Sequence, residues 1–270
     1  MSNGLKRGSG MAISLRWGAA AVLLAVTGAS VRAEMSADEK TEIGTIIRDY
    51  LLANPEVLEE AIDVLQQRRK DEAASAQTET IAAASDLIFR SEHQAVVGNP
   101  MGAITLVEFF DYNCGYCKRA VSDMNALIEA NPDLRIVLKE FPILSEGSMQ
   151  AARVSAAVKD AAPERFLEFH ETLFSRPGPA DYSKALAVAG DLGLDADALK
   201  AAAGSDAITA NLQEVQELAG RLGISGTPSY VIGMELVPGA VGYDGLQQKV
   251  AAARAASAEG AGDSQPDSTN

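Results

Sequence analysis

The apolar positions between residues 36 and 65 recur at the spacing of amphipathic helices. They form two groups: Ile43, Ile46, Ile47, Tyr50 and Leu51, then Val57, Leu58, Ala61, Ile62 and Leu65. Ser36 and Glu39 form a capping box ahead of the first group, and Pro55 suits the first position of a second helix. Two helices are therefore expected, followed to residue 92 by a charged, solvated linker that is compatible with a helix.

The pattern changes after the turn signal Gly98-Asn99-Pro100. Residues 103–110 (AITLVEFF) and 134–141 (LRIVLKEF) are short runs with few polar positions. Such runs are typical of strands buried on both faces of a sheet. A helix is expected between them, through about residue 130. The order strand, helix, strand predicts the βαβ unit of a parallel sheet.

Residues 148–222 contain no convincing strand and predict a series of helices with caps or glycine stops. The runs SYVIG and ELVPGAV then predict a β-hairpin around Gly233-Met234. A final helix is expected from about residue 244 to 255, and residues 257–270 predict a disordered tail. The expected organisation is a helical segment and linker at 34–92 and a main domain at 93–256, with a helical insertion at about 148–222.

The first 33 residues have the pattern of a cleaved signal peptide. Basic residues precede a short apolar run, and Val31 and Ala33 occupy the positions that a signal peptidase reads. Cleavage is expected between Ala33 and Glu34. An uncleaved membrane anchor is the alternative, although the run is shorter than the roughly 20 apolar residues that a spanning helix needs.

The charge of the chain argues against some classes of binding partner. The formal net charge is −14, and removing the basic signal segment makes it more negative. A strongly acidic protein is a poor partner for nucleic acid or for an anionic membrane surface. An exported, oxidising compartment would also let a cysteine pair persist as a disulfide.

Cys114 and Cys117 are the only two cysteines of the chain. A bridge closing so short a loop would constrain the unfolded chain very little, so a purely structural role is not favoured. A closed zinc site needs four ligands, and the two histidines, His93 and His170, stand alone in helical contexts. No metal site and no cofactor are therefore expected, while weak binding of Cu(I) by two thiolates stays open.

The placement of the cysteines favours redox chemistry. A C-x-x-C pair that follows a strand and opens a helix is the thioredoxin-type context. Unpaired N–H groups and the helix dipole at Cys114 favour an anion, and a thiolate is an anion. Cys114 is expected to attack a substrate disulfide and Cys117 to resolve the mixed disulfide, with Gly115 and Tyr116 tuning the thiolate.

Two further features accompany the cysteine pair. Thr227-Pro228 precedes a predicted strand; Pro228 is either an ordinary strand-start proline or a cis proline facing the dithiol, with the Thr227 backbone pairing with a bound peptide. Glu108 is either a glutamate at a sheet edge or a buried carboxylate that assists proton transfer at Cys117. Lys139 and Glu140 could be its charge partners or a solvated pair.

Three segments carry a family resemblance: VEFFDYNCGYCKRA, KEFPILSEGS and GISGTPSYVIG, in that order around a helical insertion. Over about residues 95–256 the chain resembles the DsbA-like thiol–disulfide oxidoreductases of bacterial envelopes. The segment IRDYLLANPEVLEEAIDVLQQRR is similar to the N-terminal extension of the ScsC and Com1-type subgroup. The resemblance implies an α/β thioredoxin fold with an inserted α-helical domain, preceded by a helical N-terminal oligomerisation segment. It also implies a Cys114–Cys117 dithiol, a cis Pro228 and Glu108 near the buried cysteine.

The resemblance further implies a periplasmic enzyme that acts on unfolded or misoxidised secreted proteins. CGYC and a threonine before the cis proline are also found in DsbC-type isomerases, which puts isomerase ahead of oxidase. An isomerase would need a DsbD-like membrane reductase, and an oxidase would need a DsbB-like partner. A homo-oligomer is expected, as in trimeric members of the subgroup. The alternatives are a copper-binding, chaperone-like protein, and a monomer in which residues 36–92 pack on the domain.

Overall fold

The computed structural model describes residues 35–262. The expected signal peptide, residues 1–33, and the end of the expected tail lie outside the described residues. The chain separates into two compact units, the first ending at Ile62 and the second beginning at Asp63. None of the described helices is long and apolar enough to cross a membrane.

The first unit contains α1 (Ala37–Ala53), and α2 (Glu56–Ala83) begins in it. The expected capping box is present: the Ser36 side chain accepts from the Glu39 N–H, and the Glu39 carboxylate accepts from the Ser36 N–H. No residue of α1 is buried. The second helix does not stop before the charged stretch but runs through it to Ala83, because the stretch lacks glycine and proline.

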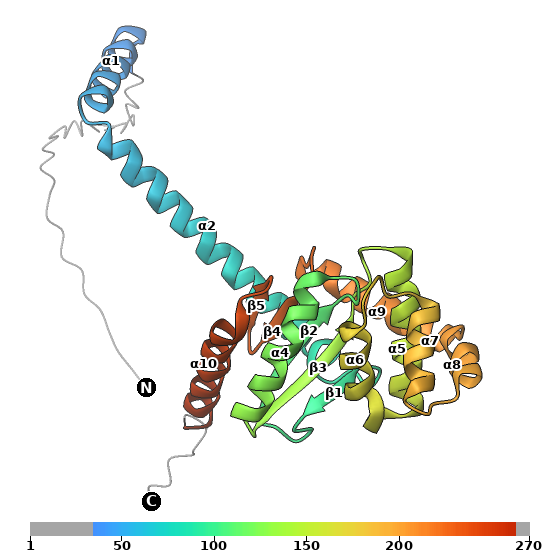
Figure 1. Ribbon diagram of the computed structural model, residues 1–270. Coiled ribbons are helices and arrows are strands. Elements are labelled where there is room, and N and C mark those ends of the chain that lie inside the picture. The colour runs from blue at the N-terminus through green and yellow to red at the C-terminus, as the bar shows by residue number, and fades with distance from the viewer. Residues whose placement is uncertain (1–34, 263–270) are drawn as a thin grey trace, which may run out of the picture. The chain divides into compact units, whose positions relative to one another are not determined.

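The second unit is built on a five-stranded mixed sheet with the order β1-β3-β2-β4-β5 (Figure 1). The predicted βαβ unit is confirmed: it consists of β2 (Ile104–Phe110), α4 (Gly115–Ala130) and β3 (Leu134–Glu140), and the two strands are parallel. The predicted hairpin is also confirmed, as β4 (Ser229–Ile232) and β5 (Glu235–Pro238). Antiparallel pairing of β4 with β2 places the hairpin beside the central strand.

One strand was missed by the sequence analysis. β1 (Ala95–Gly98) lies at the edge of the sheet, antiparallel to β3, and Ala95 pairs with Leu138. Its four residues are too few to display a strand period. Gly98, which adopts φ 75°, ends the strand at a point where a Cβ would meet the Leu134 carbonyl oxygen at 2.7 Å.

The predicted helical insertion is confirmed. It comprises α5 (Glu146–Ala161), the 3₁₀ turn η1 (Pro163–Arg165), α6 (Phe166–Ser175), α7 (Tyr182–Asp191), α8 (Ala196–Ala203) and α9 (Asp206–Leu222). In Figure 1, α5, α7 and α8 gather at one side of the sheet, away from α10. The last helix, α10, spans Gly242–Gly262. The expectation of a disordered tail from residue 257 is therefore wrong for residues 257–262, which continue the helix from the alanine-rich stretch before them.

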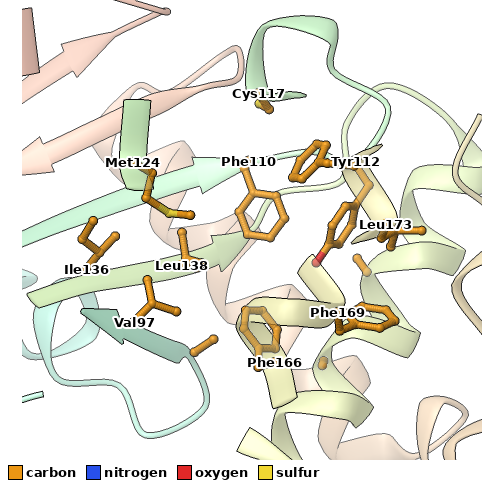
Figure 2. Close-up of a cluster of buried hydrophobic side chains, with 14 of the residues drawn as sticks. Val97, Phe110, Tyr112, Cys117, Met124, Ile136, Leu138, Phe166, Phe169 and Leu173 are labelled. Carbon is orange, nitrogen blue, oxygen red and sulfur yellow. The ribbon is translucent and has the colours of Figure 1, made fainter. Parts of the chain in front are cut away.

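The sheet has a core on each face. Leu106 and Phe110 of β2 contribute to the larger core, shared with the helical insertion, and Figure 2 shows Phe110 and Tyr112 beside Phe166 and Phe169 of that region. Val107 and Phe109 point to the smaller core, as alternation along a strand requires. The run of apolar residues in β2 thus reflects burial on both faces.

The smaller core reaches back into the expected linker. Ile81 of α2, Ala84 between the helices and Ile88 of α3 (Ser85–Phe89) are buried in one cluster with Val107 and Phe109. Packing of the second unit therefore begins at residue 81, within the segment assigned to the linker. Charged residues dominate the linker before residue 81. For that reason the helical spacing of the three apolar residues after them was overlooked in the sequence.

Candidate active site

Cys114 occupies the N-cap of α4, so the cysteine pair straddles the start of the helix that follows β2. The Cys117 N–H donates to the Cys114 sulfur at 3.4 Å. This is the placement at which orphan N–H groups and the helix dipole stabilise a negatively charged sulfur. Both cysteines are free thiols here.

The two sulfurs have different surroundings. Cys114 is 7% exposed and lines a groove of about 510 Å³, whereas Cys117 is 1% exposed. Burial, reinforced by the negative charge of Glu108, raises the pKa of the Cys117 thiol well above its usual range. Cys114 is therefore the accessible sulfur, and Cys117 is held as a protonated thiol beneath it.

The cis-proline segment lies against Cys114. The Thr227–Pro228 peptide bond is cis, as expected from the sequence. The Cys114 thiol donates to the Thr227 carbonyl oxygen at 3.2 Å, across 113 residues of sequence. The Thr227 hydroxyl is buried and has no hydrogen-bond partner among the described residues. Proximity to Thr227 places a backbone segment where it can pair with an extended peptide bound at Cys114.

The two residues between the cysteines face outward. Tyr116 is 59% exposed, and the Arg119 guanidinium lies 4.4 Å from the centre of its ring. A Cβ added at Gly115 would meet nothing within 4 Å. Both residues therefore border the surface that a substrate would contact.

Glu108 is buried in the central strand β2, 5% exposed, and it pairs in register with Tyr230 of β4. The sheet-edge alternative is therefore wrong. Burial, with repulsion from Asp123 on α4, raises the pKa of Glu108 to about 8. Glu108 is thus a protonated carboxyl at neutral pH, close enough to Cys117 for its charge to affect that thiol.

Neither expected partner of Glu108 acts as one. The Lys139 ammonium donates to the Leu87 carbonyl oxygen at 2.7 Å, and Glu140 accepts from the Ser155 hydroxyl at 2.9 Å. Both are buried rather than solvated, and burial lowers the pKa of Lys139 to about 8 and raises that of Glu140 to about 7. Consecutive strand residues point to opposite faces, which separates the two side chains.

Asp111 and Asn113 fix the loop between β2 and α4 that leads to the cysteines. The sequence analysis did not identify either residue. The buried Asp111 carboxylate accepts from the N–H groups of Asn113, Ile143 and Leu144 at 2.8–3.0 Å. The Asn113 side chain donates to the Ala180 carbonyl oxygen at 2.9 Å and accepts from the Ala180 N–H at 2.6 Å. The loop before α4 is thereby tied to both the β3–α5 connection and the helical insertion.

A buried polar network adjoins this loop. The Tyr112 hydroxyl lies 2.8 Å from the Ser155 hydroxyl and 3.1 Å from Nδ1 of His170, and Ser155 donates to Glu140. Burial lowers the pKa of His170 to about 3, so the imidazole is neutral. The aromatic rings of Phe110 and Phe174 pack around the network. Its members are far apart in sequence, and the sequence analysis did not identify it.

Residues 105–251 match the family described as the DSBA-like thioredoxin domain. The chain belongs to this family. Residues 39–72 separately match the copper resistance protein ScsC N-terminal domain. The two matches confirm the resemblance inferred from the motifs, and the thioredoxin fold with a helical insertion agrees with it.

Individual relatives agree with the assignment. The Proteus mirabilis ScsC structure in a transitional conformation is 33% identical, with a TM-score of 0.60, and the match covers 83% of this chain and 98% of that chain. A thioredoxin-like oxidoreductase from Silicibacter pomeroyi DSS-3 is 40% identical, with a TM-score of 0.60 and coverages of 63% and 96%. Disulfide bond formation protein D of Bacillus subtilis (strain 168) is 25% identical over 167 residues, 58% of this chain and 75% of that protein.

Membership in the DsbA-like family makes this chain a thiol–disulfide oxidoreductase. Further curated relatives are Na(+)/H(+) antiporters NhaA, of which the chain spans only 17% to 23% of the length. The site geometry supplies what the oxidoreductase reaction requires: an accessible sulfur at a helix N-terminus and a second, buried thiol one turn away.

Proposed function

We propose that this protein is a periplasmic thiol–disulfide oxidoreductase that works on exported proteins and favours disulfide isomerisation. The observation that carries the proposal is the pairing of Cys114 at the N-cap of α4 with the Thr227 carbonyl oxygen 3.2 Å away. A reactive sulfur and a backbone edge for a peptide are thereby placed side by side.

In the proposed reaction the Cys114 thiolate attacks one sulfur of a substrate disulfide. A Cys114–substrate S–S bond forms, the substrate S–S bond breaks, and the second substrate sulfur leaves as a thiolate. In isomerisation another substrate thiolate attacks the mixed disulfide, a new substrate disulfide forms and Cys114 is released without net oxidation. When Cys117 attacks instead, the protein dithiol is oxidised and the substrate is reduced.

Glu108 is proposed to serve Cys117. The Cys117 thiol must lose its proton to attack, and its buried surroundings oppose a negative charge. The pKa of Glu108, about 8, allows it to give or take a proton near neutral pH. Glu108 in its ionised form would accept the proton released from Cys117 and hold it as the mixed disulfide resolves.

Self-association through α1 is proposed as the source of an isomerase-like arrangement. Ile43, Ile46, Ile47 and Tyr50 are between 43% and 60% exposed, and they recur at the spacing of one helix face. A second copy of the same face would bury them, and a homo-oligomer, with a trimer as one form, would bring several dithiols together. The match of residues 39–72 to the ScsC N-terminal domain supports this proposal.

The oligomer proposal is tested by light scattering on the chain lacking residues 1–33. Ile47→Lys should reduce the mass per particle toward that of one chain, because a lysine would be buried in the α1 interface. Thr45→Lys adds the same charge on the opposite face of α1 and should leave the mass unchanged. Equal masses for wild type and Ile47→Lys would contradict self-association through this face.

The direction of the reaction is tested separately. The protein should reduce insulin and should restore activity to scrambled ribonuclease, and Cys114→Ser should abolish both activities. Disulfide donation to a reduced substrate without repair of the scrambled one would favour a DsbA-type oxidase with a DsbB-like partner. A dithiol found fully oxidised in the envelope would likewise contradict an isomerase maintained by a DsbD-like reductase.

A copper-binding, chaperone-like role is the second candidate, favoured by the N-terminal match to a copper resistance protein. Two thiolates in one turn can hold Cu(I). Absence of activity in both the insulin and the ribonuclease assay, together with Cu(I) binding that is lost in Cys114→Ser, would replace the enzyme proposal with this one.

A further inference from the structure

The groove beside Cys114 has a composition unlike that of the whole chain. It lies between the start of α4, the connection before α5 and the segment that joins α6 to α7. Lys118, Arg176 and Lys184 line it, together with Cys114, and its lining contains no aspartate or glutamate. The chain as a whole carries a net charge of −14. The groove is therefore a locally positive site on a chain that is acidic overall.

Two of the three cations, Lys118 and Lys184, are held in place by backbone carbonyl groups. The Lys118 ammonium donates to the Ser175 carbonyl oxygen at 3.4 Å, and the Lys184 ammonium donates to the Arg176 carbonyl oxygen at 3.1 Å. These carbonyl groups orient the ammonium groups but do not neutralise their charge. Arg176 has an ion pair with Asp191, which lies outside the groove lining. Lys118 and Lys184 thus face the groove with no lining carboxylate to balance them.

The cations also act on one another. Partial burial and the positive charge of Lys118 lower the pKa of Lys184, and the charge of Arg176 adds to this effect, while the carboxylate of Asp181, outside the groove lining, opposes it. Mutual repulsion of this kind is relieved when an anion enters. The groove therefore has an electrostatic preference for a negatively charged ligand before any ligand is present.

The rest of the groove suits a peptide rather than a free ion. Leu144, Leu173, Phe174 and Pro179 give it an apolar wall, and its volume of about 510 Å³ accommodates a few side chains. Cys114 lines the groove and also contacts the Thr227 carbonyl oxygen. A substrate joined to Cys114 would therefore extend the residues next to its own cysteine into the groove.

We propose that the groove lined by Lys118, Arg176 and Lys184 selects substrates that carry an aspartate or glutamate near the cysteine that Cys114 attacks. The substrate carboxylate replaces solvent among the three cations, while its neighbouring side chains contact Leu144 and Pro179, the exposed apolar residues of the lining. This specificity rests on the proposed function, because it describes the substrate of the same dithiol.

A competing role for the cations would be to stabilise the Cys114 thiolate. That role would change the reaction with every disulfide to the same extent. A specificity role instead changes the ratio of rates for two substrates that differ only in charge. The ratio is therefore the quantity to measure.

The test uses the reduced full-length mature protein and two fluorogenic peptide disulfides. One peptide has glutamates beside its cysteine and the other has glutamines at the same positions. Oxidation of the protein dithiol is coupled to reduction of the peptide, so no other oxidant is needed. At low salt the glutamate peptide should react about fivefold faster, the size of a partly solvated ion pair. In about 1 M salt, where screening acts over about 3 Å, the ratio should approach one.

Charge variants locate the effect. Lys118→Glu should reduce the rate ratio to one or below, and Lys118→Gln should give an intermediate ratio. Lys200→Gln removes the same charge from α8, outside the groove lining, and should keep the wild-type ratio. Equal rates for both peptides in the wild type, or a ratio unchanged in Lys118→Glu, would overturn this inference alone. No reaction with either peptide would overturn the proposed function and this inference with it.

Discussion

The two sulfurs of the dithiol are three residues apart, yet they lie in opposite environments. Cys114 caps a helix, contacts the Thr227 carbonyl and opens into a groove lined by cations. Cys117 is buried below it, beside a carboxyl group in the central strand, and its thiol resists ionisation. The helix N-terminus alone would treat neighbouring thiols similarly; burial and the nearby charge separate them.

The proposed order of action of the two sulfurs follows from this difference. The first attack needs a sulfur that substrate can reach, and Cys114, which lines the groove at the N-cap of α4, is that sulfur. The inner thiol is needed only after a mixed disulfide has formed, and its protonation before that step prevents it from reacting early. Changes on the inner side should therefore affect the resolution of the mixed disulfide, and changes on the outer side should affect attack and substrate choice, while changes on either side can alter stability.

The largest effect on stability is expected from Glu108→Gln. With a pKa of about 8 in the folded protein and about 4.5 unfolded, Glu108 stays protonated on folding while the unfolded chain ionises. The unfolded state therefore binds fewer protons, and wild-type stability falls by about 1.4 kcal/mol per pH unit from this group across that range. Glutamine does not ionise, so the variant does not lose the free energy needed to keep residue 108 protonated on folding. It should be more stable than the wild type by about 4 kcal/mol at pH 8 and by nearly nothing at pH 4.

The measurement is urea unfolding of the reduced protein at several pH values. Glu129→Gln, at an exposed position of α4, should track the wild type at every pH. Glu108→Gln should also slow the resolution of a mixed disulfide by Cys117, because the proton acceptor is gone. A stability difference that stayed flat between pH 4 and pH 8 would contradict a protonated, buried Glu108.

A smaller effect, in the opposite direction, is expected from Asp111→Asn on the outer side, which should lose stability. The amide has one acceptor oxygen, whereas the carboxylate accepts from three backbone N–H groups. Loss of charged hydrogen bonds at a buried site should cost about 3 kcal/mol and loosen the loop that carries Cys114. Thermal or urea unfolding measures the cost, and Asp86→Asn, at an 80% exposed ion pair, should change stability by less than about 0.5 kcal/mol.

The smallest effect is expected from Tyr112→Phe. The substitution removes the hydroxyl that joins Ser155 to His170 but keeps the ring packed against Phe110. It should destabilise the protein by about 1–2 kcal/mol, since buried polar partners lose a hydrogen bond. Tyr116→Phe, at an exposed ring, is the matched control for stability. Equal stabilities for the two variants would show that the network contributes nothing.

The sequence predicted those elements and residues that are marked by a pattern within a short stretch of chain. Continuous apolar runs identified β2 and β3, and helical spacing of apolar residues identified the insertion. In each case the pattern that reflects burial lies within the residues of the element itself. Cys114, Cys117 and Pro228 stood out for the same reason, since each sits in a short motif at a strand or helix boundary. The four-residue strand β1 and the helical end of α10 lacked such a signal.

The remaining features depend on contacts between distant segments. Asp111 holds Ile143 and Leu144, and Tyr112 meets His170 across 58 residues. Neither contact produces a periodic pattern of residues that could be recognised in the sequence. Burial of Glu140 likewise depends on Ser155 of α5 lying against β3. Single-sequence patterns therefore located the dithiol but not the side chains that hold and tune it.

The division of labour between the two sulfurs can be measured directly by trapping the intermediate. Reduced Cys117→Ser and Cys114→Ser proteins are each mixed with a model peptide disulfide, and the adducts are counted by intact mass. Cys117→Ser should accumulate a stable mixed disulfide at Cys114, because attack proceeds and resolution does not, while Cys114→Ser should form almost none. Comparable or faster adduct formation at Cys117 in the Cys114→Ser protein would contradict the account.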